Sequence, residues 1–146
     1  MTWSAASIAN AFLERASRAG TPVSPMKLQK LCYLAHGYHL AETAEPLVDE
    51  LFEAWKFGPV LPSLYHQAKG FGNGRVSRYL SDYDPETRRD IPSPAPENPV
   101  AMQIIDFVWD NYGNVDAMDL SVWTHEKEGP WDRTVRSKPV FLRNMT

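Results

Sequence analysis

The amino-acid sequence predicts a single α+β domain, residues 1–146, that is predominantly α-helical, with about five helices around a central helix and a small β piece. Three observations predict this class. Apolar residues recur at helical spacing in several segments, and capping residues stand at the ends of those segments. One short aromatic-rich segment lacks this spacing and is followed by Gly and Pro. A hydrophobic content of 43% supplies enough apolar surface for one core.

The first predicted helix runs from Ala5 to Ala19. Ser4 is a suitable N-cap, and Gly20 stands where a helix end commonly takes a left-handed residue. The apolar positions repeat every three or four residues, whereas several polar residues, Asn10 among them, fall elsewhere on the helical wheel. One face of this helix is therefore expected to be buried.

The central helix is predicted over residues 27–41, after Ser24 as N-cap and Pro25 in the first turn. Its apolar residues form two separate arcs on the helical wheel, so other elements must pack on both sides. We therefore place Leu28 to Leu40 at the centre of the fold. Leu31 and Ala35, together with Trp55 and Trp123 from other segments, are expected to serve the core.

The β piece is expected from Glu50 to Phe57, which ends at Gly58 and Pro59, together with part of the region from Ser77 to Ile91. A short helix should follow from Pro62 to about Gly70 or Gly72.

From Asn73 to Pro99 the helical spacing disappears and prolines accumulate, which predicts an exposed loop with at most a brief strand near Tyr79 or Ile91. Asn98 and Pro99 then begin a helix that Gly113 ends. A last helix is expected from Asp116 to about Gly129, followed by a turn at Pro130 and Trp131.

Composition excludes several classes of protein. The net charge of −3 argues against the strong basic field of a dedicated nucleic-acid binder, although a local basic patch remains an alternative. The sequence contains no run of about 18 apolar residues, so it predicts no membrane span. At its start, no basic segment precedes a long apolar stretch, so it predicts no secretory signal. We therefore expect a cytoplasmic protein without membrane contact. A single cysteine, Cys32, can form neither an internal disulfide nor a thiolate zinc site.

Three blocks of sequence carry a resemblance to a known family. They read KLQKLCYLAHGYHLA at residues 27–41, FEAWKFGPVLPSLYHQAKGFG at residues 52–72 and LSVWTHEKEGPW at residues 120–131. On these blocks the chain resembles the Panacea domain family of SocA-like antitoxins, which also has members among phage-associated proteins. The similarity spans nearly the whole chain and is weakest from Asn73 to Pro99.

The resemblance implies an antitoxin that binds and neutralises a protein toxin, often one encoded by an adjacent gene. It leaves two modes open, which are occlusion of the toxin and delivery of the toxin to a protease by an adaptor. It implies no catalytic centre and no cofactor. We expect the toxin to dock where the similarity is densest, on a surface that comprises Lys27, Lys30, Lys56, Tyr65 and His66. The alternative is that the three lysines only solvate the fold.

Other chemistries are weighed against this function. His36, His39, His66 and His125 suggest a metal site, and Cys32 beside His36 or His39 suggests a thiol with a base. We expect instead that these side chains pack in the fold and that the protein is not an enzyme. The rival to toxin binding is an operator-binding regulator that uses Arg75, Arg78, Arg88 and Arg89. Those arginines are interrupted by Asp82, Asp84, Glu86 and Asp90, which favours a solvated loop.

Overall fold

The computed structural model describes residues 1–56, 58–116 and 142–143. In chain order these residues form α1 (Ala5–Ala19), α2 (Pro25–Thr43), β1 (Phe52–Trp55), β2 (Gly58–Val60), α3 (Pro62–Ala68), the 3-10 helix η1 (Lys69–Phe71), β3 (Ser81–Asp84), β4 (Arg89–Pro92), α4 (Pro99–Tyr112) and β5 (Leu142–Arg143). The predicted helix-dominated α+β class is confirmed. The last predicted helix, with Trp123, and the turn at Trp131 fall on residues 117–141, outside the described residues.

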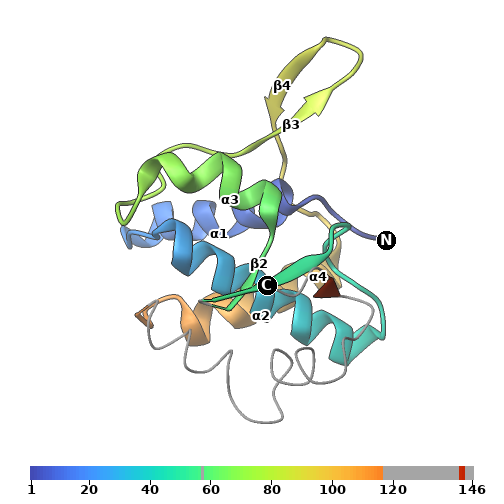
Figure 1. The fold of residues 1–146 in the computed structure, drawn as a ribbon. Coiled ribbons are helices and arrows are strands. Elements are labelled where there is room, and N and C mark those ends of the chain that lie inside the picture. The colour runs from blue at the N-terminus through green and yellow to red at the C-terminus, as the bar shows by residue number, and fades with distance from the viewer. Residues whose placement is uncertain (57, 117–141, 144–146) are drawn as a thin grey trace.

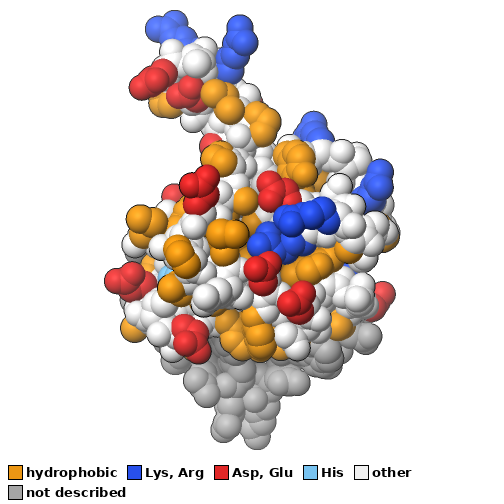
Figure 2. Space-filling model, turned by 180° about the vertical axis from the view of Figure 1, so that it is seen from behind, with side chains coloured by type: hydrophobic (Ala, Val, Ile, Leu, Met, Phe, Trp, Pro, Cys, Tyr) orange, Lys and Arg blue, Asp and Glu red, His pale blue; other side chains and the backbone are white. Residues whose placement is uncertain are grey.

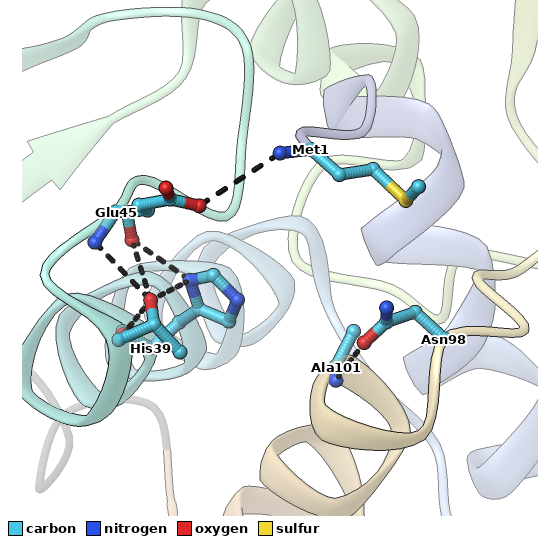
Figure 3. A network of polar contacts seen from close by, with 6 residues as sticks. Met1, His39, Glu45, Asn98 and Ala101 are labelled. Atoms are coloured by element: carbon cyan, nitrogen blue, oxygen red, sulfur yellow. Dashed lines mark hydrogen bonds and ion pairs between the residues drawn. The ribbon is translucent and has the colours of Figure 1, made fainter.

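Capping residues start the three long helices where the sequence predicts. The hydroxyl of Ser4 accepts a hydrogen bond from the Ser7 amide at α1, and the hydroxyl of Ser24 accepts one from the Lys27 amide at α2. At α4 the side chain of Asn98 accepts from the amides of the first turn (Figure 3). Gly20 ends α1 in the left-handed region with φ 66°.

Helix α2 lies at the centre of the fold, as predicted. It packs against α1, α3, α4 and β2 (Figure 1). Leu28, Leu31 and Ala35 are fully buried among these elements. Helices α1 and α4 also contact each other, and an ion pair joins them, with Arg15 Nε 2.7 Å from a carboxylate oxygen of Asp106. Within the described residues no helix is long and apolar enough to cross a membrane.

The strands form two separate sheets. Strand β1 lies between β2, to which it is antiparallel, and β5, to which it is parallel. Strands β3 and β4 pair only with each other within the described chain. The expectation of one β piece built from Glu50–Phe57 and part of Ser77–Ile91 is therefore wrong. The chain reverses directly after β1, so that Gly58 to Val60 continue the sheet as β2 rather than end it.

The β3–β4 hairpin projects away from the helices (Figure 1). The sequence predicts at most a brief strand near Tyr79 or Ile91. The structure has two strands here, since β4 contains Ile91 and β3 begins two residues after Tyr79. Asp84 organises the turn, because its carboxylate accepts hydrogen bonds from the amide of Glu86 and the hydroxyl of Thr87. The amide of Arg88 donates to the Asp84 carbonyl, and Arg88 takes φ 57°.

Candidate partner-binding surface

Aromatic side chains stack at the surface where β1 meets α3. The ring centroids of Trp55 and Tyr65 are 5.0 Å apart in an edge-on arrangement, and those of Tyr65 and His66 are 5.6 Å apart. Tyr65 is 41% exposed, and both His66 and Lys56 are exposed. We call Trp55, Lys56, Tyr65 and His66 the aromatic patch. It contains three of the five predicted docking residues: Tyr65 and His66 are in ring contact, and Lys56 directly follows Trp55 in the chain.

Trp55 does not serve the core as the sequence analysis expects. Side chains alternate between the two faces of a strand, and in β1 Phe52 and Ala54 are buried whereas Glu53 and Trp55 are only half-buried. The indole Nε1 of Trp55 donates to a carboxylate oxygen of Glu53 at 2.8 Å. Trp55 therefore supports the surface ring of Tyr65 from the outer face of β1.

Lys27 and Lys30 are buried, so the expectation that they lie at the surface, either for docking or for solvation, is wrong. Their exposed fractions are 8% and 1%. The Lys27 ammonium donates to the carbonyl of Gly113, and burial lowers the pKa of Lys27 while Asp116 opposes that change. Burial lowers the pKa of Lys30 to about 8. The two lysines are buried because several elements surround α2. A helical wheel does not show how many neighbours a helix has.

His36 and His39 fasten the segment that follows α2. The Nδ1 atom of buried His36 accepts a hydrogen bond from the Val48 amide at 3.2 Å. The Nδ1 atom of His39 lies 2.8 Å from the carbonyl oxygen of Glu45 and 3.2 Å from the Thr43 hydroxyl (Figure 3). Both rings therefore have structural partners at the C-terminal end of α2 or beyond it.

The burial of His36 predicts a loss of stability in acid. Desolvation, reinforced by the charge of His39, lowers the pKa of His36 from 6.5 to about 4. Between these values the unfolded chain binds more protons than the folded chain, so the free energy of unfolding falls as pH drops from 6.5 to 4. The expected contribution is about 3 kcal/mol. It should be fully present above pH 6.5.

Chemical denaturation at a series of pH values measures this loss. His36→Asn retains an acceptor for the Val48 amide but cannot titrate, so its free energy of unfolding should vary less between pH 6.5 and 4 than that of the parent. Parallel pH profiles for the two proteins would show that His36 is not the responsible group.

Neither a metal site nor a reactive thiol is built from the described residues. Among them, no group of three His, Cys, Asp or Glu side chains lies close enough to hold a metal ion. Cys32 is fully buried, and desolvation raises the pKa of its thiol, so the thiolate form is strongly disfavoured. His125 lies outside the described residues.

The four arginines of the predicted loop are divided between two places, since Arg75 and Arg78 line one pocket and Arg88 and Arg89 belong to the hairpin. Arg78 lies over the ring of Phe71, with 5.5 Å from its guanidinium carbon to the ring centroid. Arg88 and Arg89 lie at the end of the hairpin, where Figure 2 shows basic side chains beside acidic ones. Mixed charge of this kind does not provide the continuous positive path that tracks a phosphate backbone.

Three amide side chains hold distant backbone segments, and the sequence analysis does not identify them. Each amide both accepts from an N–H group and donates to a carbonyl of a single residue: Asn10 pairs with Leu80, Gln29 with Leu61 and Gln67 with Ser81. Asn10 also donates to the carbonyl of Ser93 at 2.8 Å. The expectation that Asn10 lies off the buried face of α1 is wrong, because its side chain is only 2% exposed.

Comparison with known proteins identifies relatives. The family model described as Antitoxin SocA-like, Panacea domain, matches residues 28–132, a stretch that contains both the aromatic patch and the hairpin. The curated protein Antitoxin SocA from Caulobacter vibrioides (strain NA1000 / CB15N) is 34% identical over 128 residues, which cover 88% of this chain and 68% of that relative. No solved structure matches.

Proposed function

This chain belongs to the SocA-like, Panacea-domain family of antitoxins, and on that premise we propose that it binds a protein toxin and neutralises it through the aromatic patch. The toxin is expected to be encoded by an adjacent gene. The observation that carries the choice of surface is the edge-on packing of half-buried Trp55 against exposed Tyr65, which in turn packs edge-on against exposed His66.

The aromatic patch has the properties of a protein-binding surface. Aromatic side chains offer a large contact area and lose little conformational entropy on binding, and they are enriched at the residues that dominate binding energies. Stacking on Trp55 already restrains the ring of Tyr65 before a partner arrives. Lys56 adds a charge at the edge, where it can raise the rate of association with an acidic surface.

Co-expression with the toxin tests this proposal. The triple variant Lys56→Glu, Tyr65→Ala, His66→Ala should lose most protection against the toxin in growing cells. Its melting temperature should remain close to that of the parent, because each altered side chain is exposed and an exposed charge contributes about 1 kcal/mol at most.

A matched control changes exposed residues on α4. Met102→Ala with Asp110→Lys removes one exposed apolar side chain and reverses one exposed charge, and it should protect as well as the parent. Full protection by a folded patch variant would place the docking surface elsewhere. A parent chain that neither binds nor protects against the toxin of the adjacent gene would refute toxin neutralisation itself.

The two modes of neutralisation predict different amounts of toxin. Occlusion leaves the toxin intact in a stable complex, so purified antitoxin alone should inhibit purified toxin. Delivery to a protease removes the toxin from cells and requires the protease. The toxin half-life in cells, measured with the parent and with the patch variant, distinguishes these modes.

A further inference from the structure

The β3–β4 hairpin combines a firmly held base with exposed strands. Every residue of β4 is exposed, as are Asp82 and Tyr83 in the middle of β3. An isolated two-stranded hairpin is only marginally stable in water. Its position therefore depends on the base, where the chain leaves and re-enters the helical body.

Buried polar contacts fix that base. The amide of Asn10 on α1 bonds to Leu80 before the hairpin and to Ser93 after it. The amide of Gln67 on α3 pairs with both backbone groups of Ser81 at 2.9 Å. Side chains from α1 and α3 thus fix the base of the β3–β4 hairpin, although the hairpin contributes little to the core.

The acidic residues of the hairpin differ in what they contact. One carboxylate oxygen of Asp82 accepts hydrogen bonds from the hydroxyls of Ser4 and Ser93, each at 2.5 Å. The carboxylate of Asp84 is engaged in the turn. For Asp90, which is exposed, the described part of the chain provides neither a side-chain hydrogen bond nor an ion pair. Asp90 therefore presents a carboxylate that takes part in no ion pair with the described residues.

The register of the hairpin places this charge beside an aromatic ring. Tyr83 of β3 lies directly opposite Asp90 of β4, so both side chains leave the same face. Both line a groove of about 560 Å³ with Gln67, Arg78, Tyr79, Ser81 and Asp82. Tyr79 and Tyr83 are 47% and 62% exposed. The cation in the groove, Arg78, is engaged with the Phe71 ring and with the Gln67 carbonyl.

We infer that this groove is a second toxin contact, which takes an Arg or Lys side chain from an extended segment of the toxin. The inference rests on the proposed function. A carboxylate attracts the cationic group, tyrosine rings bind its face by cation–π contact, and an extended segment fits along β3, whose outer edge pairs with no other strand in the described chain. Charge complementarity thus specifies a basic partner segment at the hairpin, apart from the aromatic patch.

Binding of the purified toxin to hairpin variants tests the inference. Asp90→Arg reverses the free charge and should weaken the affinity at least tenfold, and Asp90→Asn should weaken it by a smaller factor. Glu86→Arg makes the same charge change in the turn, away from the groove, and should stay within twofold of the parent. All three variants should keep the melting temperature of the parent.

A charge exchange identifies the partner side chain. One Arg or Lys of the toxin, when reversed to Glu, should restore affinity for the Asp90→Arg variant. Parent-like binding by Asp90→Arg, in a protein whose aromatic-patch variant fails to bind, would refute the hairpin contact alone. Failure of the parent to bind the toxin would refute the proposed function instead.

Discussion

Leu31→Asp is expected to unfold the domain. Leu31 is fully buried in α2, between elements that pack on several sides of that helix. The substitution removes a packed side chain, which alone costs about 2–5 kcal/mol, and it places a carboxyl group at a fully buried position, where desolvation disfavours the charged form. Domains of this size are stable by only about 5–15 kcal/mol, so the soluble folded fraction should collapse.

Soluble yield and denaturant unfolding measure this effect. Leu31→Met, which nearly conserves volume, should cost less than about 1.5 kcal/mol. Ala41→Asp introduces the same carboxylate at an exposed position of the same helix and should leave the domain folded. A Leu31→Asp protein that melts like the parent and loses only toxin binding would show that α2 is an exposed interface.

The long helices are predictable because their signals are local. Each combines apolar spacing with a capping side chain within three residues of the amide that it satisfies, as at Ser4, Ser24 and Asn98. Helix α2 nevertheless extends two residues beyond its predicted end at Ala41. Its C-cap is Ala44, which adopts the left-handed region. Alanine rarely adopts that conformation, so the residue type does not predict the helix end.

The errors concern features that depend on distant residues. Lys27 and Lys30 are buried because several elements pack around α2, whereas the spacing of residues along a helix shows only which of them share a face. Trp55 is at the surface because β1 alternates, and its size alone suggests the opposite. The three proposed docking residues that are exposed, Lys56, Tyr65 and His66, come from a block that resembles the family in sequence.

The hairpin is the clearest case. Strand β3 carries no apolar alternation, since Ser81, Asp82 and Asp84 are polar and the single aromatic residue, Tyr83, is exposed. Its position is set by the side chains of Asn10 and Gln67, and Asn10 is 70 positions away from Leu80. The helical wheel places Asn10 off the apolar face of α1, so the spacing of residues gives no signal for this contact. The partners of Asn10 become visible only in the folded chain.

Asn10→Ala is therefore expected to be the most destabilising change at the hairpin base. The side chain makes three hydrogen bonds of 2.7–2.8 Å in a buried site. Its removal leaves the Leu80 amide and the Ser93 carbonyl without these partners, and each orphaned buried group costs about 1–3 kcal/mol. The Leu80 carbonyl is less affected, because it also accepts from the Ser93 amide. For these two groups the expected total is about 2–6 kcal/mol.

Denaturant unfolding and hydrogen exchange test this expectation together. Asn111→Ala is the matched control, because its amide is exposed and donates only within α4, to the Phe107 carbonyl at 2.8 Å; it should cost about 1 kcal/mol or less. In Asn10→Ala the amide of Leu80 should exchange faster than the global unfolding rate allows, because the hairpin base opens locally. A variant that unfolds within about 1 kcal/mol of the parent, with Leu80 still protected, would show that backbone contacts alone hold the hairpin.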